Sequence, residues 1–108
     1  METAQLQLED RNFCRVCKAL SNPVRLQILR YVLAHPGCIG NQILLHLPED
    51  APHAQSTLSQ HLRVLRTAGL LEAEEDGPAV CYFVNQDCLV WLCHEITDLQ
   101  QVPISSAR

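Results

Sequence analysis

Apolar residues recur at every third or fourth position through most of the chain, a spacing typical of amphipathic helices. This periodicity predicts five helices, over residues 6–20, 24–33, 39–47, 54–68 and 87–100. Local signals mark several helix ends. Ser21 or Asn22 can cap the second helix and Pro23 suits its first turn, whereas Gly69 follows the fourth helix, where glycine commonly ends one. The chain is therefore expected to be mostly α-helical.

The period shortens after the fourth helix, where the sequence favours two strands. Residues 70–74 are expected to form one strand, residues 76–78 a turn, and residues 79–84 a second strand rich in β-forming side chains. Four helices, a hairpin and a fifth helix make a winged helix-turn-helix, a mostly α fold with a small β-hairpin wing. A single domain is expected over residues 1–101, followed by a flexible tail over residues 102–108.

The fourth predicted helix separates apolar from polar side chains as a DNA-reading helix requires. Leu58, Leu62 and Leu65 fall at intervals of four and three residues and would dock the helix on the domain. The polar positions expected to meet phosphates and base edges are Gln55, Ser56, Thr57, Ser59, Gln60, His61 and Arg63. No acidic residue interrupts them to repel the DNA backbone. The pattern would also fit an ordinary surface helix. The acidic wing and the negative net charge leave a winged-helix module that contacts only proteins as an alternative.

Two separated motifs resemble one protein family in their order and spacing. They are Lys-Ala-Leu-Ser-Asn-Pro-Val-Arg-Leu-Gln-Ile-Leu at residues 18–29 and Gln-Ser-Thr-Leu-Ser-Gln-His-Leu-Arg-Val-Leu-Arg-Thr-Ala-Gly-Leu at residues 55–70. Together they are similar to the ArsR/SmtB family of metal-responsive repressors, and in particular to its arsenic-sensing type. The resemblance implies a homodimer joined through the first and last helices. It also implies that the dimer represses by binding a double-stranded DNA operator, with residues 55–63 as the recognition surface, until an inducer docks.

Two segments depart from the family pattern. The turn between the two DNA-binding helices, Pro-Glu-Asp-Ala-Pro-His at residues 48–53, is longer than the usual few residues. The wing carries Glu-Ala-Glu-Glu-Asp at residues 72–76, where a wing that touches DNA would normally carry basic residues. We therefore expect the wing to contribute little to DNA affinity, or mainly to restrict how the dimer sits on the duplex.

Charge is unevenly distributed along the 108 residues. The net charge of −4 alone argues against DNA as a partner. Basic residues nevertheless cluster between Arg11 and Arg30 with no acid among them, and Arg63 and Arg66 lie in a second acid-free stretch. A positive face on an acidic body fits a DNA-binding domain. No apolar run is long enough to cross a bilayer and the acidic start lacks a signal-peptide pattern, so a cytoplasmic protein with no membrane partner is expected.

Six cysteines supply the candidate chemistry. A reducing compartment would keep them as thiols, which bind soft metals. Cys14 and Cys17, three residues apart on one helix, project close enough together to share a soft ion. The family's arsenic-type Cys-x-Cys site is only partly present, because Cys38 fits and Gly40 stands where the second thiol would be. We hypothesise that Cys14, Cys17 and Cys38, shared or not between subunits, bind arsenite, antimonite or another soft metal ion as the inducer, with no permanently bound cofactor.

Other interpretations of the cysteines stay open. A thiol of the first or second helix could pair with one of the last helix in a disulfide or persulfide switch, which would make the repressor redox-responsive. Cys81, Cys88 and Cys93 form the competing set. Cys17 and Cys93 lie on apolar helix faces, so each could instead be a small hydrophobic residue in a core or an interface.

Two further classes of site are disfavoured. The family's zinc site on the last helix needs an Asp-x-His pair, and here Leu89 stands two residues after Asp87. His94 and Asp98 lie one turn apart on the same helix, a spacing more typical of a solvated surface pair. No nucleophile motif or glycine-rich loop indicates an enzyme.

Overall fold

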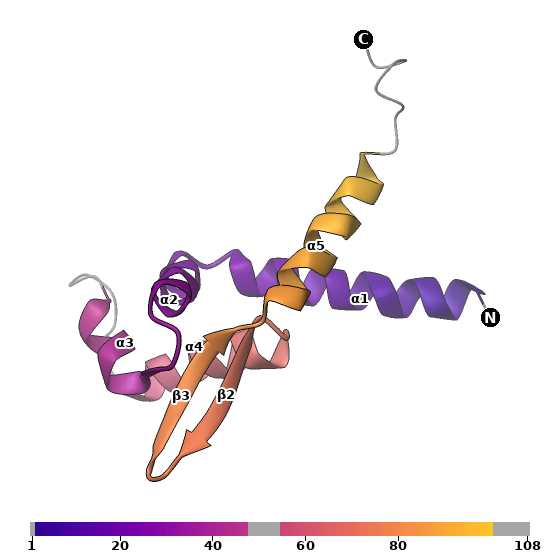
Figure 1. The fold of residues 1–108 in the computed structure, drawn as a ribbon. Coiled ribbons are helices and arrows are strands. Elements are labelled where there is room, and N and C mark those ends of the chain that lie inside the picture. Colours follow the sequence, from indigo (N-terminus) through magenta and orange to yellow (C-terminus); the bar gives the residue numbers. More distant parts are fainter. Residues whose placement is uncertain (1, 48–54, 101–108) are drawn as a thin grey trace.

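The computed structural model describes residues 2–47 and 55–100, with side chains from residue 10 onward. These residues form α1 (Glu2–Leu20), α2 (Pro23–Ala34), β1 (Cys38–Ile39), α3 (Gly40–His46), α4 (Gln55–Thr67), β2 (Leu71–Asp76), β3 (Ala79–Val84) and α5 (Gln86–Leu99). The predicted helices and hairpin are confirmed, and their arrangement is a winged helix-turn-helix (Figure 1). The long turn and the tail predicted from the sequence lie outside the described residues.

The corner between α1 and α2 is fixed by side chains that satisfy free backbone groups. The Asn22 side-chain oxygen accepts the backbone N–H groups of Val24 and Arg25 at 2.9 and 3.2 Å, and Pro23 opens α2, as predicted. The Arg25 guanidinium donates to the carbonyl oxygens of Ala19 at 2.8 Å and Lys18 at 3.0 Å. The Arg25 guanidinium therefore binds carbonyls at the end of α1, while its backbone N–H lies in the capped first turn of α2.

A short strand that the sequence pattern did not predict completes the sheet. The three strands are antiparallel in the order β1-β3-β2, and Cys38 pairs with Tyr82 while Ile39 pairs with Cys81. The third helix accordingly starts at Gly40 rather than at Ile39. Two residues are too few to show an alternating pattern, which is why this strand escaped prediction.

The hairpin of β2 and β3 projects away from the helices as a wing (Figure 1). Leu71 pairs with Val84 at its base and Asp76 pairs with Ala79 near its tip. The tip turns at Gly77, whose φ of 61° favours glycine. Strand β2 is longer than predicted and begins one residue later, so the acidic segment is part of the strand itself.

The core lies where α1, α2, α3 and α4 meet the base of the sheet. Its buried side chains are Val16, Ala19, Ile28, Leu29, Val32, Cys38, Ile43, Leu47, Leu58, Leu62, Leu65, Leu70, Leu71 and Leu92. Helix α5 contributes Leu92 alone to this set, although Phe13 of α1 meets Trp91 edge to face at 6.5 Å. None of the helices described is long and apolar enough to cross a membrane.

Candidate nucleic-acid interface

Helix α4 is anchored by the three leucines that the sequence predicted. Leu58, Leu62 and Leu65 are all buried against the core. Ser56, Gln60 and Arg63 are exposed and recur at intervals of four and three residues, so they share the outward face of the helix. This face presents a hydroxyl, an amide and a guanidinium, which are groups that bind phosphates and base edges.

The other predicted recognition residues border this face in different ways. Gln55 is exposed in the first turn, and Thr57 is half-buried. Ser59 lies on the side of α4 that faces the wing. The half-buried His61 lies on the side toward α2, where burial and, to a lesser extent, the Arg25 charge lower the pKa of its imidazole. The neutral imidazole is therefore favoured, and Ser56, Gln60 and Arg63 form the centre of the exposed polar face.

An open groove of about 780 Å³ runs between α4 and the wing. Ser59, Arg63 and Arg66 line its helical side, and Glu72 and Tyr82 line its wing side. Within residues 10–47 and 55–100, neither arginine has a hydrogen-bonded or ion-paired partner. Both guanidinium groups are therefore free to meet an anion.

Tyr82 is a groove residue that the sequence interpretation did not single out. The alternation of strand β3 carries the signal, because Tyr82 shares a face with Val84, which pairs with the buried Leu71. That face is directed toward the domain body. Counting alternate positions from Leu71 would have placed Tyr82 beside α4.

The wing differs from α4 in charge. Glu72, Glu74, Glu75 and Asp76 are all exposed, and none of them forms an ion pair within residues 10–47 and 55–100. Four uncompensated carboxylates on one strand produce a negative local potential. The acidic wing seen in the sequence is thus presented to solvent.

Comparisons with known proteins agree with this architecture, although no protein-family model matches the chain. The HTH-type transcriptional regulator YgaV of Escherichia coli K12 is 30% identical over 88 residues, which cover 82% of this chain and 85% of that protein. A solution structure from Mycobacterium bovis, a homodimeric winged helix-turn-helix DNA-binding domain of a possible ArsR-family regulator, is 31% identical with a TM-score of 0.64. That match covers 87% of this chain and 84% of the other. The chain belongs to the ArsR family of winged helix-turn-helix transcriptional regulators.

This ArsR-family regulator is also similar to a solved structure whose role is named. The crystal structure of a possible transcriptional regulator for arsenical resistance is 27% identical with a TM-score of 0.63, over 79% of this chain and 82% of that one. The relatives compared are transcriptional regulators rather than enzymes. The family resemblance found in the sequence is confirmed.

The ArsR-family regulator holds its predicted sensor cysteines in two different settings. Cys14 and Cys17 are both exposed on α1 and border one shallow depression together with Arg11, Arg15 and Lys18. Cys38 is buried in β1, and burial raises the pKa of its thiol, with a smaller contribution from the charge of Cys81. Among the residues that the structure describes, no three His, Cys, Asp or Glu side chains are grouped to hold a metal ion. One subunit therefore does not bring the three predicted thiols together.

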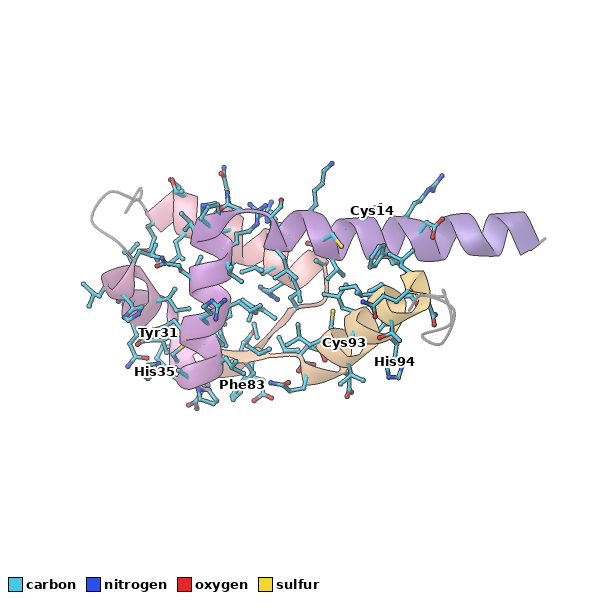
Figure 2. The ribbon with its side chains drawn as sticks, turned by 90° about the horizontal axis from the view of Figure 1, so that it is seen from above. Cys14, Tyr31, His35, Phe83, Cys93 and His94 are labelled. Atoms are coloured by element: carbon cyan, nitrogen blue, oxygen red, sulfur yellow. The ribbon has the colours of Figure 1, made fainter. Side chains whose placement is uncertain are left out.

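The exposure of two further thiols corrects the expectation that they could belong to the core. Cys17 and Cys93 are exposed, so neither is a core residue within this chain (Figure 2 shows Cys14 and Cys93 on different helices). Cys88 is half-buried and its Sγ lies 4.0 Å from the Ala68 carbonyl oxygen. All six cysteines are free thiols. Cys14, Cys17 and Cys93 are therefore the exposed thiols of the single chain.

Proposed function

We propose that this regulator is a repressor that places α4 in the major groove of an operator. The observation that carries the proposal is the exposed, acid-free face of Ser56, Gln60 and Arg63 on a helix anchored by buried leucines. Gln60 is suited to bidentate recognition of adenine, and Arg63 to guanine or to a phosphate. Gln55, Thr57 and Ser59 would contact the backbone or flanking bases.

The groove between α4 and the wing supports a second contact, with the DNA backbone. The unpaired Arg63 and Arg66 line it, and each phosphate that a guanidinium neutralises releases a condensed counterion. Affinity that depends on these residues would fall steeply with salt. The exposed carboxylates of the wing would oppose close approach of a neighbouring phosphate, so α4 would supply most of the attraction.

A homodimer through α1 and α5 is part of the proposal. Val90, Ile96 and Leu99 of α5 are 53%, 45% and 73% exposed, and Cys93 lies among them. Apolar side chains gathered on one helix are costly in water and favour burial against a partner. The related Mycobacterium bovis domain is homodimeric. A second copy of this chain is the proposed occupant of the face.

The proposed inducer is a trivalent arsenic or antimony species that binds Cys14 and Cys17. Two thiols displace two hydroxyls from As(OH)₃, forming two As–S bonds and releasing two waters with no change in oxidation state. The positions of these thiols, one turn apart and both exposed, support such a chelate. A related structure is that of a possible regulator for arsenical resistance.

Cys38 is proposed as the third thiol, in exchange for the last hydroxyl on arsenic. Because Cys38 is buried and burial raises its pKa, its recruitment requires β1 to open or a partner subunit to approach it. That movement would pull on the strand immediately before α3. An inducer that favours the opened geometry would disfavour DNA binding, since a ligand shifts an equilibrium only by its differential affinity.

The proposed function is tested by operator binding with and without arsenite. Duplexes are first selected from a random-sequence library by the full-length protein, and binding is then measured by fluorescence anisotropy in a phosphine reductant, which does not compete as a dithiol. Gln60→Ala should weaken binding while Gln86→Ala, an exposed control on α5, should not. Failure to select any duplex, or equal binding by both variants, would overturn the assignment of α4.

Cysteine variants test the inducer separately. Arsenite should release wild-type protein from DNA, and Cys14→Ser combined with Cys17→Ser should abolish release, while Cys93→Ser should retain it. Cys38→Ser should weaken arsenite binding without removing it. If an oxidant or a persulfide donor released the wild-type protein from DNA and arsenite did not, the redox-responsive alternative would replace the metal proposal.

A further inference from the structure

A small pocket lies where three elements meet: α1, the C-terminal end of α4 and the first turns of α5. Its volume is about 270 Å³. The floor is made by Val16, Ala68, Cys88 and Trp91, and the rim on α1 carries Asn12 and Arg15. None of these residues belongs to the proposed DNA face, and only Arg15 also borders the depression that holds Cys14 and Cys17.

The four floor residues carry apolar or weakly polar side chains, and Thr67, Gly69 and Asn85 complete the lining with more polar groups. Val16 is buried, and Ala68, Cys88 and Trp91 are half-buried. Burial raises the pKa of the Cys88 thiol, so at neutral pH it presents a neutral, polarisable sulfur rather than a charge. The indole of Trp91 is held edge to face against Phe13 at 73°. The floor therefore offers the aromatic surface of Trp91 and the polarisable sulfur of Cys88.

The rim has the opposite character. Asn12 and Arg15 are exposed and three residues apart on α1, so their side chains project side by side. Within the residues described with side chains, neither forms a hydrogen bond or an ion pair. Among the side chains described from residue 10 onward, no carboxylate lines the pocket. A cation and an amide with no protein partner therefore stand at the mouth of an apolar floor.

We propose that this pocket binds a small aromatic carboxylate. The ring would rest on Trp91, Val16 and the Cys88 sulfur, and the carboxylate would accept hydrogen bonds from the Arg15 guanidinium. The volume lies just below the range typical of sites for drug-sized molecules, which selects a single-ring ligand. The pocket touches the end of α4, so any effect of its ligand on DNA rests on the function proposed above, but the binding itself does not.

The intrinsic fluorescence of the protein reports directly on this site, because Trp91 is the only tryptophan. Benzoate is titrated into the full-length protein at neutral pH, with benzamide as the uncharged probe of the same shape. Benzoate should give a saturable change in emission, and benzamide should bind at least several-fold more weakly. No saturable change, or equal binding of the two probes, would overturn the proposal.

Two charge variants locate the carboxylate. Arg15→Gln should weaken benzoate binding by roughly fivefold or more, the loss expected for one charge-assisted contact. Arg11→Gln, the same change on the same helix but outside the pocket, should leave binding unchanged. Equal loss in both variants would mean general charge attraction and would contradict a built site.

Alkylation of Cys88 gives an independent readout. Saturating benzoate should slow the reaction of Cys88 with iodoacetamide, followed by peptide mass spectrometry, without slowing that of the exposed Cys17. Unprotected Cys88 would place the ligand elsewhere. Because these measurements use no DNA, they separate failure of this site from failure of the proposed operator binding.

Discussion

Helix α4 and the wing are adjacent in sequence and line one groove, yet they differ in how they are anchored and in their charge. Three buried leucines anchor α4, and no acid lies along it. The wing is held mainly by its backbone ladder, with Leu71 as its one buried side chain, and its β2 strand carries four exposed carboxylates. Rigid anchoring and positive charge thus coincide in the helix, whereas the hairpin combines weak anchoring with negative charge. Under the proposed function, the domain separates the element that attracts a duplex from the element that restricts its approach.

The largest expected effect tests the difference in anchoring. Leu58 is 1% exposed, so Leu58→Ala should lower the free energy of unfolding by about 2–4 kcal/mol, through lost burial and the cavity that remains. Val80→Ala on the wing, where the side chain is 38% exposed, should cost less than about 1 kcal/mol. Urea unfolding followed by circular dichroism measures both. Similar losses would show that the wing is as firmly packed as α4.

The next effect tests the attraction assigned to α4. Arg63→Ala should weaken binding to a selected duplex by about tenfold, since a good base or phosphate contact contributes roughly 1–3 kcal/mol. Arg30→Ala, an exposed control on α2, should bind as the wild type does. Anisotropy titrations at several salt concentrations add a second measurement, because a lost phosphate contact also makes the salt dependence shallower. An unchanged affinity for Arg63→Ala would remove α4 from the interface.

A smaller effect tests the restriction assigned to the wing. Glu74→Lys replaces an exposed carboxylate by a cation and should tighten DNA binding by about threefold at low salt, with a steeper salt dependence. Asp98→Lys makes the same charge change on α5 and serves as the control. Equal tightening by both variants would trace the effect to net charge rather than to the position of the wing.

The smallest effect concerns pH and the side of α4 that faces α2. The pKa of His61 is lowered in the folded protein by burial and by Arg25, so the unfolded chain binds the proton more readily. The stability contributed by neutral His61 is present above its unfolded pKa and is lost as the pH falls through and below that value. His61→Gln should therefore flatten the decrease in stability between neutral and mildly acidic pH, whereas His94→Gln, an exposed control, should not. Thermal unfolding across this pH range provides the measurement.

Local chemistry explains what the sequence could and could not predict. The cap of α2 and the leucine spacing of α4 are encoded within a few residues; the sequence predicted the leucines and narrowed the cap to Ser21 or Asn22, of which the structure shows Asn22. Strand β1 depends on pairing with β3, more than forty positions away, so its two residues carry no local signal. The exposure of Cys17 also depends on what packs against α1, because an apolar face is wider than the area its neighbours cover. Spacing placed His61 with the recognition residues, but only the neighbouring Arg25 shows which side it occupies.

Arg25 links three helices of the domain. Its guanidinium donates to two carbonyls near the end of α1, its backbone lies in the first turn of α2, and its charge lowers the pKa of His61 in α4. A rotation of α1 relative to α2 would strain or break these two hydrogen bonds. The corner therefore couples the orientation of α1 to that of α2. Arg25→Ala would keep both helices but remove the two hydrogen bonds that couple α1 to α2.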